Sequence, residues 1–342
     1  MDIKEFIRRM PKVELHVHLE GSIHPQTLLK LAERNNVTLP VQTLDGLKDW
    51  YQFTGFDHFV EVYLSICNCI RNADDMELIT SEFIKDRADQ NIKYSEVIFT
   101  PYTHLTHISM DDQLAAINRA RRMGEEKYGV KINMAPDISR EMRPVENSFL
   151  VADWAARNHN NGIVSLGLGG PEVGNPPEVF TSTFNRIVAS GLPATPHAGE
   201  TEGPLSIWGA IKSLRAVRIG HGVRCLEDPS LVVYLREHKI PLEVCPSSNV
   251  CLKVVPNMAA HPLPRLLEEG LIITLNSDDP AMFNTTLTDE YLHVNETFGL
   301  DEKQIRKLLL NAVDVCLLPE NEKSRLRETI QNGLDQLQKE LS

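Results

Sequence analysis

The chain has 342 residues, of which 42% are hydrophobic and 24% are charged. That much apolar sequence can build one large core or two ordinary ones. Lys and Arg number 35 and Asp and Glu number 47, so the formal net charge is −12. This balance argues against nucleic acid and anionic membranes as partners, and it favours a neutral or cationic small molecule over a polyphosphorylated one.

The cysteines and the first residues indicate an intracellular setting. None of the six cysteines forms a C-x-x-C pair, so we expect reduced thiols. The start MDIKE lacks the apolar stretch of a signal peptide, and no apolar run approaches the ~18 residues of a membrane span. We therefore expect a cytoplasmic protein that does not enter a membrane.

Short apolar, β-branched runs alternate with longer amphipathic stretches along the whole chain. The runs that predict strands are 13–19, 92–101, 130–138, 162–168, 192–197, 217–221, 240–246 and 271–277. The stretches that predict helices between them are 110–127, 145–160, 177–190, 204–215, 228–238 and 262–270. Eight such units predict an α/β fold, a (β/α)8 TIM barrel with extra helices. No linker-like composition divides the chain, so we expect 1–342 to form a single domain.

The C-terminal stretch repeats apolar residues every three or four positions, at Leu326, Ile330, Leu334, Leu337 and Leu341. This spacing predicts an amphipathic helix that packs on the barrel or on a partner. The oligomeric state stays open.

The first predicted strand contains two histidines, His16 and His18, that are separated by one residue. Alternate residues of a strand project to the same face, so both imidazoles can converge on one point. Imidazole is the commonest metal ligand in proteins. A buried strand that merely contains two histidines would look the same, so the pair needs support from elsewhere in the chain.

That support comes from the ends of other predicted strands, where polar residues gather. Active sites of (β/α)8 barrels lie at the C-terminal ends of the strands. The relevant segments are TPHAGE at 195–200, GHG at 220–222 and SDDP at 277–280. Three neutral imidazoles and a carboxylate suit one zinc ion with an open position for water. The fourth strand has no lysine that could be carboxylated to bridge two metals, so we expect one ion. The remaining histidines, including His104 and His261, are expected to be structural or exposed.

These residues carry a family resemblance. The segments MPKVELHVHLEGS at 10–22, PHAGE at 196–200, RIGHG at 218–222 and LNSDDP at 275–280 resemble the motifs of the adenosine/adenine deaminase family of the amidohydrolase superfamily. The resemblance spans nearly the whole chain. It implies a zinc-dependent hydrolase that replaces the 6-amino group of a purine by oxygen and releases ammonia.

The resemblance also implies a role for each site residue. Zinc, one ion per chain, would be held by His16, His18, His197 and Asp278. Glu200 would protonate the purine N1, and His221 would orient the attacking water and help deprotonate it. Substrate contacts would come from His18, Glu20, Gly170 and Asp279, with Gly170 at N3, Asp279 at N7 and Glu20 near a ribose hydroxyl. The proton from Glu200 makes independent sense, because attack at C6 would otherwise create a high-energy anion.

Substrate identity is less determined. Adenosine or deoxyadenosine is the favoured substrate, with adenine and a 5′-modified adenosine such as aminodeoxyfutalosine as alternatives. The chain departs from typical adenosine deaminases at Glu20, at Ile98, at 169–172 and at 248–253. Phe53, Phe56, Phe59, Val60 and Tyr63 form an apolar stripe that resembles the family's gate helix, although a core helix would show the same stripe. Another amidohydrolase activity, or a binding role without catalysis, would need no purine-specific acids.

Overall fold

The computed structural model describes residues 2–341 and contains eight strands that pair only in parallel. They are β1 (Lys12–His18), β2 (Ile92–Phe99), β3 (Lys131–Ser139), β4 (Gly167–Gly169), β5 (His197–Ala198), β6 (Ile219–His221), β7 (Leu242–Val244) and β8 (Ile273–Leu275). β1 to β4 and β5 to β8 each pair in chain order. Single bridges, Val17 to Asp278 and Leu166 to Ala194, join the two sheets. The predicted (β/α)8 barrel is thereby confirmed.

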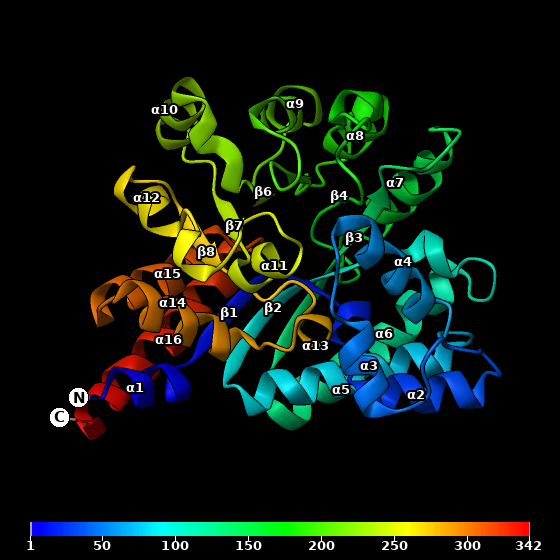
Figure 1. Ribbon diagram of the computed structural model, residues 1–342, viewed down its shortest axis with the longest axis horizontal. Coiled ribbons are helices and arrows are strands. Elements are labelled where there is room, and N and C mark those ends of the chain that lie inside the picture. Colours follow the sequence, from blue (N-terminus) through cyan, green and yellow to red (C-terminus); the bar gives the residue numbers. More distant parts are fainter. Residues whose placement is uncertain (1, 342) are drawn as a thin grey trace.

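Helices surround the strands, with α7 to α10 and α12 on the outside of the barrel (Figure 1). They are α1 (Ile3–Arg9), α2 (Pro25–Arg34), α3 (Leu44–Trp50), α4 (Phe56–Cys67), α5 (Ala73–Asp89), α6 (Met110–Tyr128), α7 (Asn147–Arg157), α8 (Thr181–Ala189), α9 (Pro204–Leu214), α10 (Pro229–Glu237), α11 (Pro246–Cys251), α12 (Leu263–Glu268), α13 (Pro280–Phe283), α14 (Leu287–Phe298), α15 (Glu302–Val315) and α16 (Glu320–Leu341). Among residues 2–341, no helix combines the length and apolar character needed to cross a membrane.

The fourth and fifth strands are shorter than their apolar runs. The run 162–168 yields β4 only from Gly167, and the run 192–197 yields β5 only from His197. Pro193 and Pro196 interrupt the second run, and proline has no N–H to donate to a neighbouring strand. The chain still pairs there through isolated bonds, such as Thr195 N–H to the Leu166 carbonyl at 3.0 Å.

The C-terminal stripe packs on the molecule itself. Leu326, Ile330, Leu334 and Leu337 are buried in α16, which lies against α1 and α15. The first and last helices, α1 and α16, therefore lie side by side (Figure 1).

The long insertion between β1 and β2 positions the roof of the site. It holds α2 to α5, and α4 packs on two short 3-10 helices, η1 (Glu20–Ser22) and η2 (Pro101–His104). Because η1 follows β1 and η2 follows β2, α4 lies over the C-terminal ends of the first two strands. This is the end at which barrel active sites form.

The barrel interior contains buried charges beneath those strand ends. Glu14 of β1 is fully buried and forms an ion pair with Arg87 of α5. Its other oxygen accepts hydrogen bonds from the backbone N–H and the hydroxyl of Ser277, at 2.9 and 2.6 Å. Glu14 therefore links β1, α5 and the segment that follows β8.

Arg87→Met should destabilise the protein by about 3–5 kcal/mol, because it leaves the Glu14 carboxylate buried without its cation. Adding Glu14→Gln should restore most of that loss. Arg119→Met removes a largely exposed pair with Glu77 and should cost less than about 1 kcal/mol. The free energy of unfolding of all three variants can be measured by denaturant titration in excess zinc. Equal losses of stability in the Arg87 and Arg119 variants would contradict the role assigned to the buried ion pair.

Candidate active site

A cavity of about 520 Å³ opens at the C-terminal ends of the strands. Its wall includes seven buried titratable side chains: His18, Asp137, His197, Glu200, His221, Asp278 and Asp279. Six of these are residues that the sequence predicted for the site, and they come from four different strand ends. The fold therefore brings together groups that lie up to 261 positions apart in the chain, from His18 to Asp279.

Four of the predicted ligands have the spacing of a tetrahedral metal site. Asp278 Oδ1 lies 3.3 Å from the Nε2 atoms of both His16 and His18. His18 Nε2 lies 3.3 Å from His197 Nε2. A tetrahedral zinc with ligand bonds of ~2.0–2.1 Å separates its ligand atoms by about 3.3 Å. All four side chains are buried, so the donor set fits one zinc ion.

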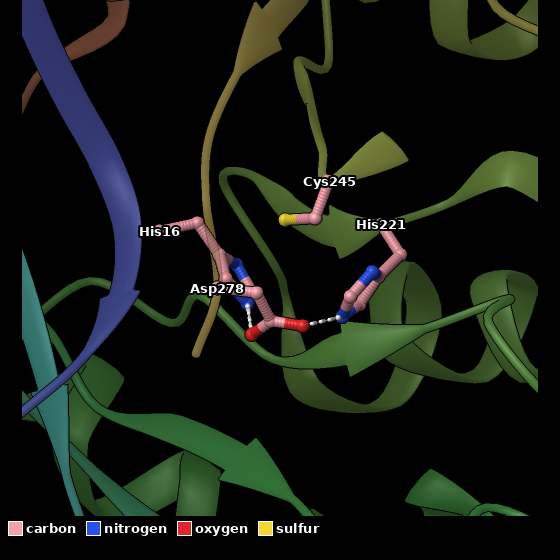
Figure 2. A group of neighbouring side chains, drawn as sticks. All are labelled: His16, His221, Cys245 and Asp278. Atoms are coloured by element: carbon pink, nitrogen blue, oxygen red, sulfur yellow. Dashed lines mark ion pairs between the residues drawn. The ribbon is translucent and has the colours of Figure 1, made fainter. Parts of the chain in front are cut away.

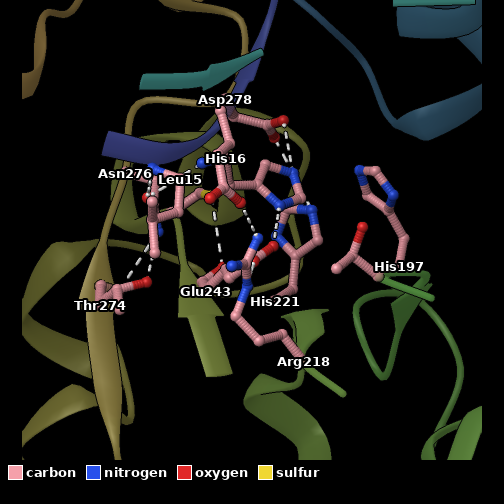
Figure 3. A network of polar contacts seen from close by, with 12 residues as sticks. Leu15, His16, His197, Arg218, His221, Glu243, Thr274, Asn276 and Asp278 are labelled. Carbon is pink, nitrogen blue, oxygen red and sulfur yellow. Dashed lines mark hydrogen bonds and ion pairs between the residues drawn. The ribbon is translucent and has the colours of Figure 1, made fainter. Parts of the chain in front are cut away.

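The ring of His16 is held in the orientation that a ligand needs. Its Nδ1 lies 2.9 Å from Glu243 Oε2 and donates to that carboxylate, which leaves the Nε2 lone pair facing Asp278. Glu243 in turn pairs with Arg218, and Arg218 pairs with Glu96. Figure 3 shows His16 between Asp278 and Glu243, with Arg218 below. Such outer carboxylates fix the tautomer of a metal ligand.

A second group of donors lies close by and shares two members with the first. His16, His221, Cys245 and Asp278 place one ligand atom each within 4.8 Å of the others (Figure 2). Burial raises the pKa of the Cys245 thiol well above its ordinary value, and the negative charge of Asp278 adds to the rise. His18 and His197 line the cavity and Cys245 does not, so the set with His18 and His197 is the one that a substrate in the cavity can reach.

Glu200 is presented to the cavity by a loop wrapped around another carboxylate. The backbone N–H groups of Gly199, Glu200 and Thr201 donate to Glu172 at 2.9, 2.8 and 2.9 Å. Burial raises the pKa of Glu200 well above its ordinary value, and the charges of Asp278 and Glu172 add to the rise. Its Oε1 is buried and has no hydrogen-bond partner among the described residues. Burial and the acidic neighbours thus favour the protonated form of Glu200, which faces the cavity.

Glu172 is a positioning residue that sequence reasoning missed. It lies in the segment GGPE at 169–172, which was noted only for its departure from the usual family pattern. Nothing local in that segment reveals that its acceptors face a loop 27 to 30 residues later.

Asp279 and Gly21 depend on each other. Asp279 is buried on the cavity wall, and burial raises the pKa of its carboxyl well above the ordinary value. A Cβ atom on Gly21 would lie 1.7 Å from Asp279 Oδ1. Only glycine at position 21 leaves room for the carboxyl, which explains the glycine after Glu20.

Gly170 and the apolar stripe also lie where a ligand would meet them. Gly170 follows β4 with a φ of +89° and lines the cavity, as do Phe56, Phe59, Val60 and Tyr63 of α4. Phe53 lies outside the cavity wall. The stripe therefore faces the cavity rather than only the core.

The predicted contact of Glu20 with a ribose hydroxyl stays a prediction, and the structure places this residue behind the cavity wall. Glu20 is fully buried and does not line the cavity. Its Oε1 accepts hydrogen bonds from His104 Nε2 at 2.9 Å and from the Thr100 backbone N–H at 3.1 Å. These two bonds fasten η1 to the end of β2, while Glu20 Oε2 is buried without a hydrogen-bond partner among the described residues.

Asp137 is a further cavity carboxyl that sequence reasoning missed. It comes from β3, and its Oδ1 accepts a hydrogen bond from the Thr100 hydroxyl at 2.6 Å. Burial raises its pKa to about 6. An acidic residue near the end of the predicted strand 130–138 was the available signal.

Comparison with known proteins places these residues in a family context. The sequence model of the family described as adenosine deaminase matches residues 11–333. The aminodeoxyfutalosine deaminase of Streptomyces avermitilis is 39% identical over 333 residues, which cover 96% of this chain and 92% of that protein. The adenine deaminase of Vibrio parahaemolyticus is 36% identical over 333 residues, covering 97% and 98% of the two chains.

Solved structures agree with this grouping. The crystal structure of adenine deaminase from Arthrobacter aurescens has a TM-score of 0.90 at 29% identity and covers 96% of this chain and 99% of that one. A zinc-bound amidohydrolase from Burkholderia ambifaria has a TM-score of 0.89 at 25% identity and covers 99% and 94%.

The two donor groups predict different outcomes for metal binding. Extensively dialysed protein should retain about one equivalent of zinc per chain. His197→Ala and Asp278→Ala should lose it, whereas Cys245→Ala should keep it. Elemental analysis of the purified variants distinguishes the groups. Loss of metal on Cys245→Ala with retention on His197→Ala would move the ion to the second group.

Proposed function

This chain belongs to the adenosine deaminase family, and we propose that within it the protein deaminates a 5′-extended adenosine with a terminal carboxylate, the class that includes aminodeoxyfutalosine. It is a hydrolase that acts on C–N bonds and removes the amino group from an adenine-like compound. The expectation of adenosine itself is revised, because the relatives reported above are named for aminodeoxyfutalosine and for adenine. Adenine is the second candidate.

The shape of the cavity favours the extended substrate over the free base. Its volume of about 520 Å³ falls within the ~300–1,000 Å³ typical of pockets for drug-sized ligands and leaves room beyond one purine. The wall continues from the buried acids to exposed residues at a rim, namely Leu64, Thr106, Glu141 and Arg143. Apolar side chains line the way, including Phe56, Phe59, Tyr63 and Met142.

One cation on the rim is the observation that carries the proposal. Arg143 is the only Lys or Arg among the described residues that line the cavity. Its guanidinium donates to the carbonyls of Arg140 and Met142, both at 2.9 Å, and to Asn175 Oδ1 at 3.0 Å. These acceptors are neutral, so the charge of Arg143 is available to an anionic ligand group. Aminodeoxyfutalosine extends adenosine at the 5′ position and ends in a benzoate, which suits an apolar wall leading to arginine.

The acids at the inner end of the cavity suit the purine ring. Glu200 donates its proton to N1, which prevents a negative charge from building on the ring as C6 is attacked. Asp279, whose pKa burial also raises, donates from its protonated form to N7, and the Gly170 backbone N–H donates to N3. His16, His18, His197 and Asp278 would hold a divalent metal, which would lower the pKa of the attacking water.

Glu200→Gln should keep the metal and the fold but lower kcat by at least ~10²-fold, the range expected for loss of a general acid. In the unmodified enzyme, activity should fall as pH rises through the raised pKa of Glu200, because proton donation requires its protonated form. Steady-state kinetics on metal-replete protein test both points. Near-normal turnover of Glu200→Gln would remove this residue from the reaction.

The substrate proposal is tested with aminodeoxyfutalosine, its methyl ester, adenosine and adenine. The unmodified enzyme should prefer the acid to the ester. Arg143→Met should lower kcat/KM for the acid by roughly ten- to a hundredfold, because a hydrogen bond to a charged group contributes ~1.5–3 kcal/mol. It should leave kcat/KM for the ester unchanged. Glu141→Gln, which removes a negative charge from the same rim, should raise kcat/KM for the acid alone.

Arg157→Met is the matched control, because Arg157 is exposed on α7 and does not line the cavity. This variant should change kcat/KM for neither the acid nor the ester. Faster turnover of adenine than of the acid would instead favour the second candidate. Equal losses of kcat/KM for the acid and the ester in Arg143→Met would rule out the proposed contact between Arg143 and the carboxylate, but not the deaminase activity.

A further inference from the structure

His221 is connected to the backbone of α12 by a buried chain of hydrogen bonds. The chain runs from the Leu263 N–H through His261 and Asn249 to His221, with donor-acceptor distances of 3.1, 3.1 and 3.4 Å. His221, Asn249 and His261 are all buried. His261 lies outside the segments compared with the family motifs, and Asn249 lies in the segment 248–253, which was noted only for its departure from the usual family pattern.

The first member of the chain determines the direction of all the others. A backbone N–H can only donate, so Nδ1 of His261 must be the acceptor for Leu263. Burial lowers the pKa of His261 to about 4, so this ring is neutral and its single proton lies on Nε2. That N–H faces Asn249 Oδ1 at 3.1 Å, which is the only orientation of the amide that avoids two donors meeting.

The amide then determines the tautomer of His221. With Oδ1 facing His261, the Asn249 Nδ2 group donates toward His221 Nδ1 at 3.4 Å. A proton on that Nδ1 would place two donors against each other. The ring proton of His221 therefore lies on Nε2, which faces Glu200 Oε2 at 3.7 Å and Asp278 Oδ2 at 3.8 Å.

We propose that Asn249 and His261 are positioning residues that hold His221 as an Nε2–H donor toward the reaction centre. This inference rests on the proposed deaminase function. A neutral imidazole with its proton on Nε2 has no lone pair there, so His221 orients oxygen by donating to it and does not take a proton from the attacking water. The implied role of His221 in deprotonating water is revised accordingly, and that proton has to pass to a carboxylate.

The tautomer can be measured directly in the zinc-loaded enzyme. Long-range ¹H–¹⁵N spectra of protein labelled on histidine nitrogen distinguish a protonated from an unprotonated ring nitrogen, and His221→Gln identifies the signals of residue 221. We expect the proton on Nε2 of His221 at neutral pH. A proton on Nδ1 would overturn the proposal whatever the activity of any variant.

Asn249→Asp separates the donor role from a base role by the sign of its effect. An aspartate oxygen facing Nδ1 attracts the ring proton to that side and frees the Nε2 lone pair. If His221 works as a donor, kcat should fall about 10²-fold with little change in KM, as for loss of a preorganised donor. If His221 were a base, the same change should maintain or raise kcat, and the proposal would be wrong.

His261→Gln and His261→Phe provide a second test that keeps Asn249 intact. The glutamine amide can still donate to Asn249 Oδ1, so His261→Gln should retain most of the activity, whereas His261→Phe should lose about tenfold in kcat. His104→Gln is the control for altering a buried histidine, since His104 pairs with Glu20 outside this chain of bonds. It should leave the His221 ring signals in place. Equal kcat values for the two His261 variants would contradict the proposal.

Discussion

The site depends on the seam that closes the barrel, by which we mean the backbone pairing of β1 with the segment after β8. Asp278 forms a backbone bridge with Val17, between the two histidines of β1. The His18 N–H donates to the Asp278 carbonyl at 2.7 Å, and the Asp278 N–H donates to the His16 carbonyl at 3.2 Å. Asn276 adds a side-chain link, because its Oδ1 accepts from the N–H groups of Leu15 and His16. The contact that joins the last strand to the first therefore also sets three of the four metal donors side by side.

Buried charge beneath the seam supports this arrangement. Glu243 orients the ring of His16 and is itself held by Arg218, which also pairs with Glu96. Burying such ions costs free energy that their mutual attraction only partly returns. The network connects β2, β7 and the residue before β6 to His16 on β1, and it fixes the orientation of that ring. Glu14 and Arg87 fasten the same strand through a separate buried pair.

The cavity contains two kinds of acid with different tasks. Glu200 and Asp279 face the ligand space, and burial raises the pKa of both carboxyls, so each can donate a hydrogen bond to a ring nitrogen. Glu20 and Glu172 accept hydrogen bonds from protein donors and hold backbone in place. The difference follows from what each carboxyl meets, since burial raises the pKa of Glu200 and Asp279, whereas for Glu20 burial is outweighed by the hydrogen bonds from His104 and the Thr100 N–H, which lower the pKa. In the proposed function, Arg143 at the rim would then distinguish ligands by the charge at their far end.

The barrel and the proposed metal donors could both be predicted from the amino-acid sequence, because both depend on local periodicity. His16 and His18 alternate along one strand, and the segments that contain His197, His221 and Asp278 each follow a recognisable apolar run, so a common edge could be inferred from the rule that parallel strands end together. The tertiary structure alone decided which acids are free to meet a ligand. Glu20 is hydrogen-bonded to His104, 84 positions away. Glu172 accepts hydrogen bonds from the loop before α9, and His221 is connected through Asn249 to His261. Such partners leave no mark in local spacing, since a carboxyl or imidazole looks the same in sequence whether its partner is substrate, backbone or another side chain.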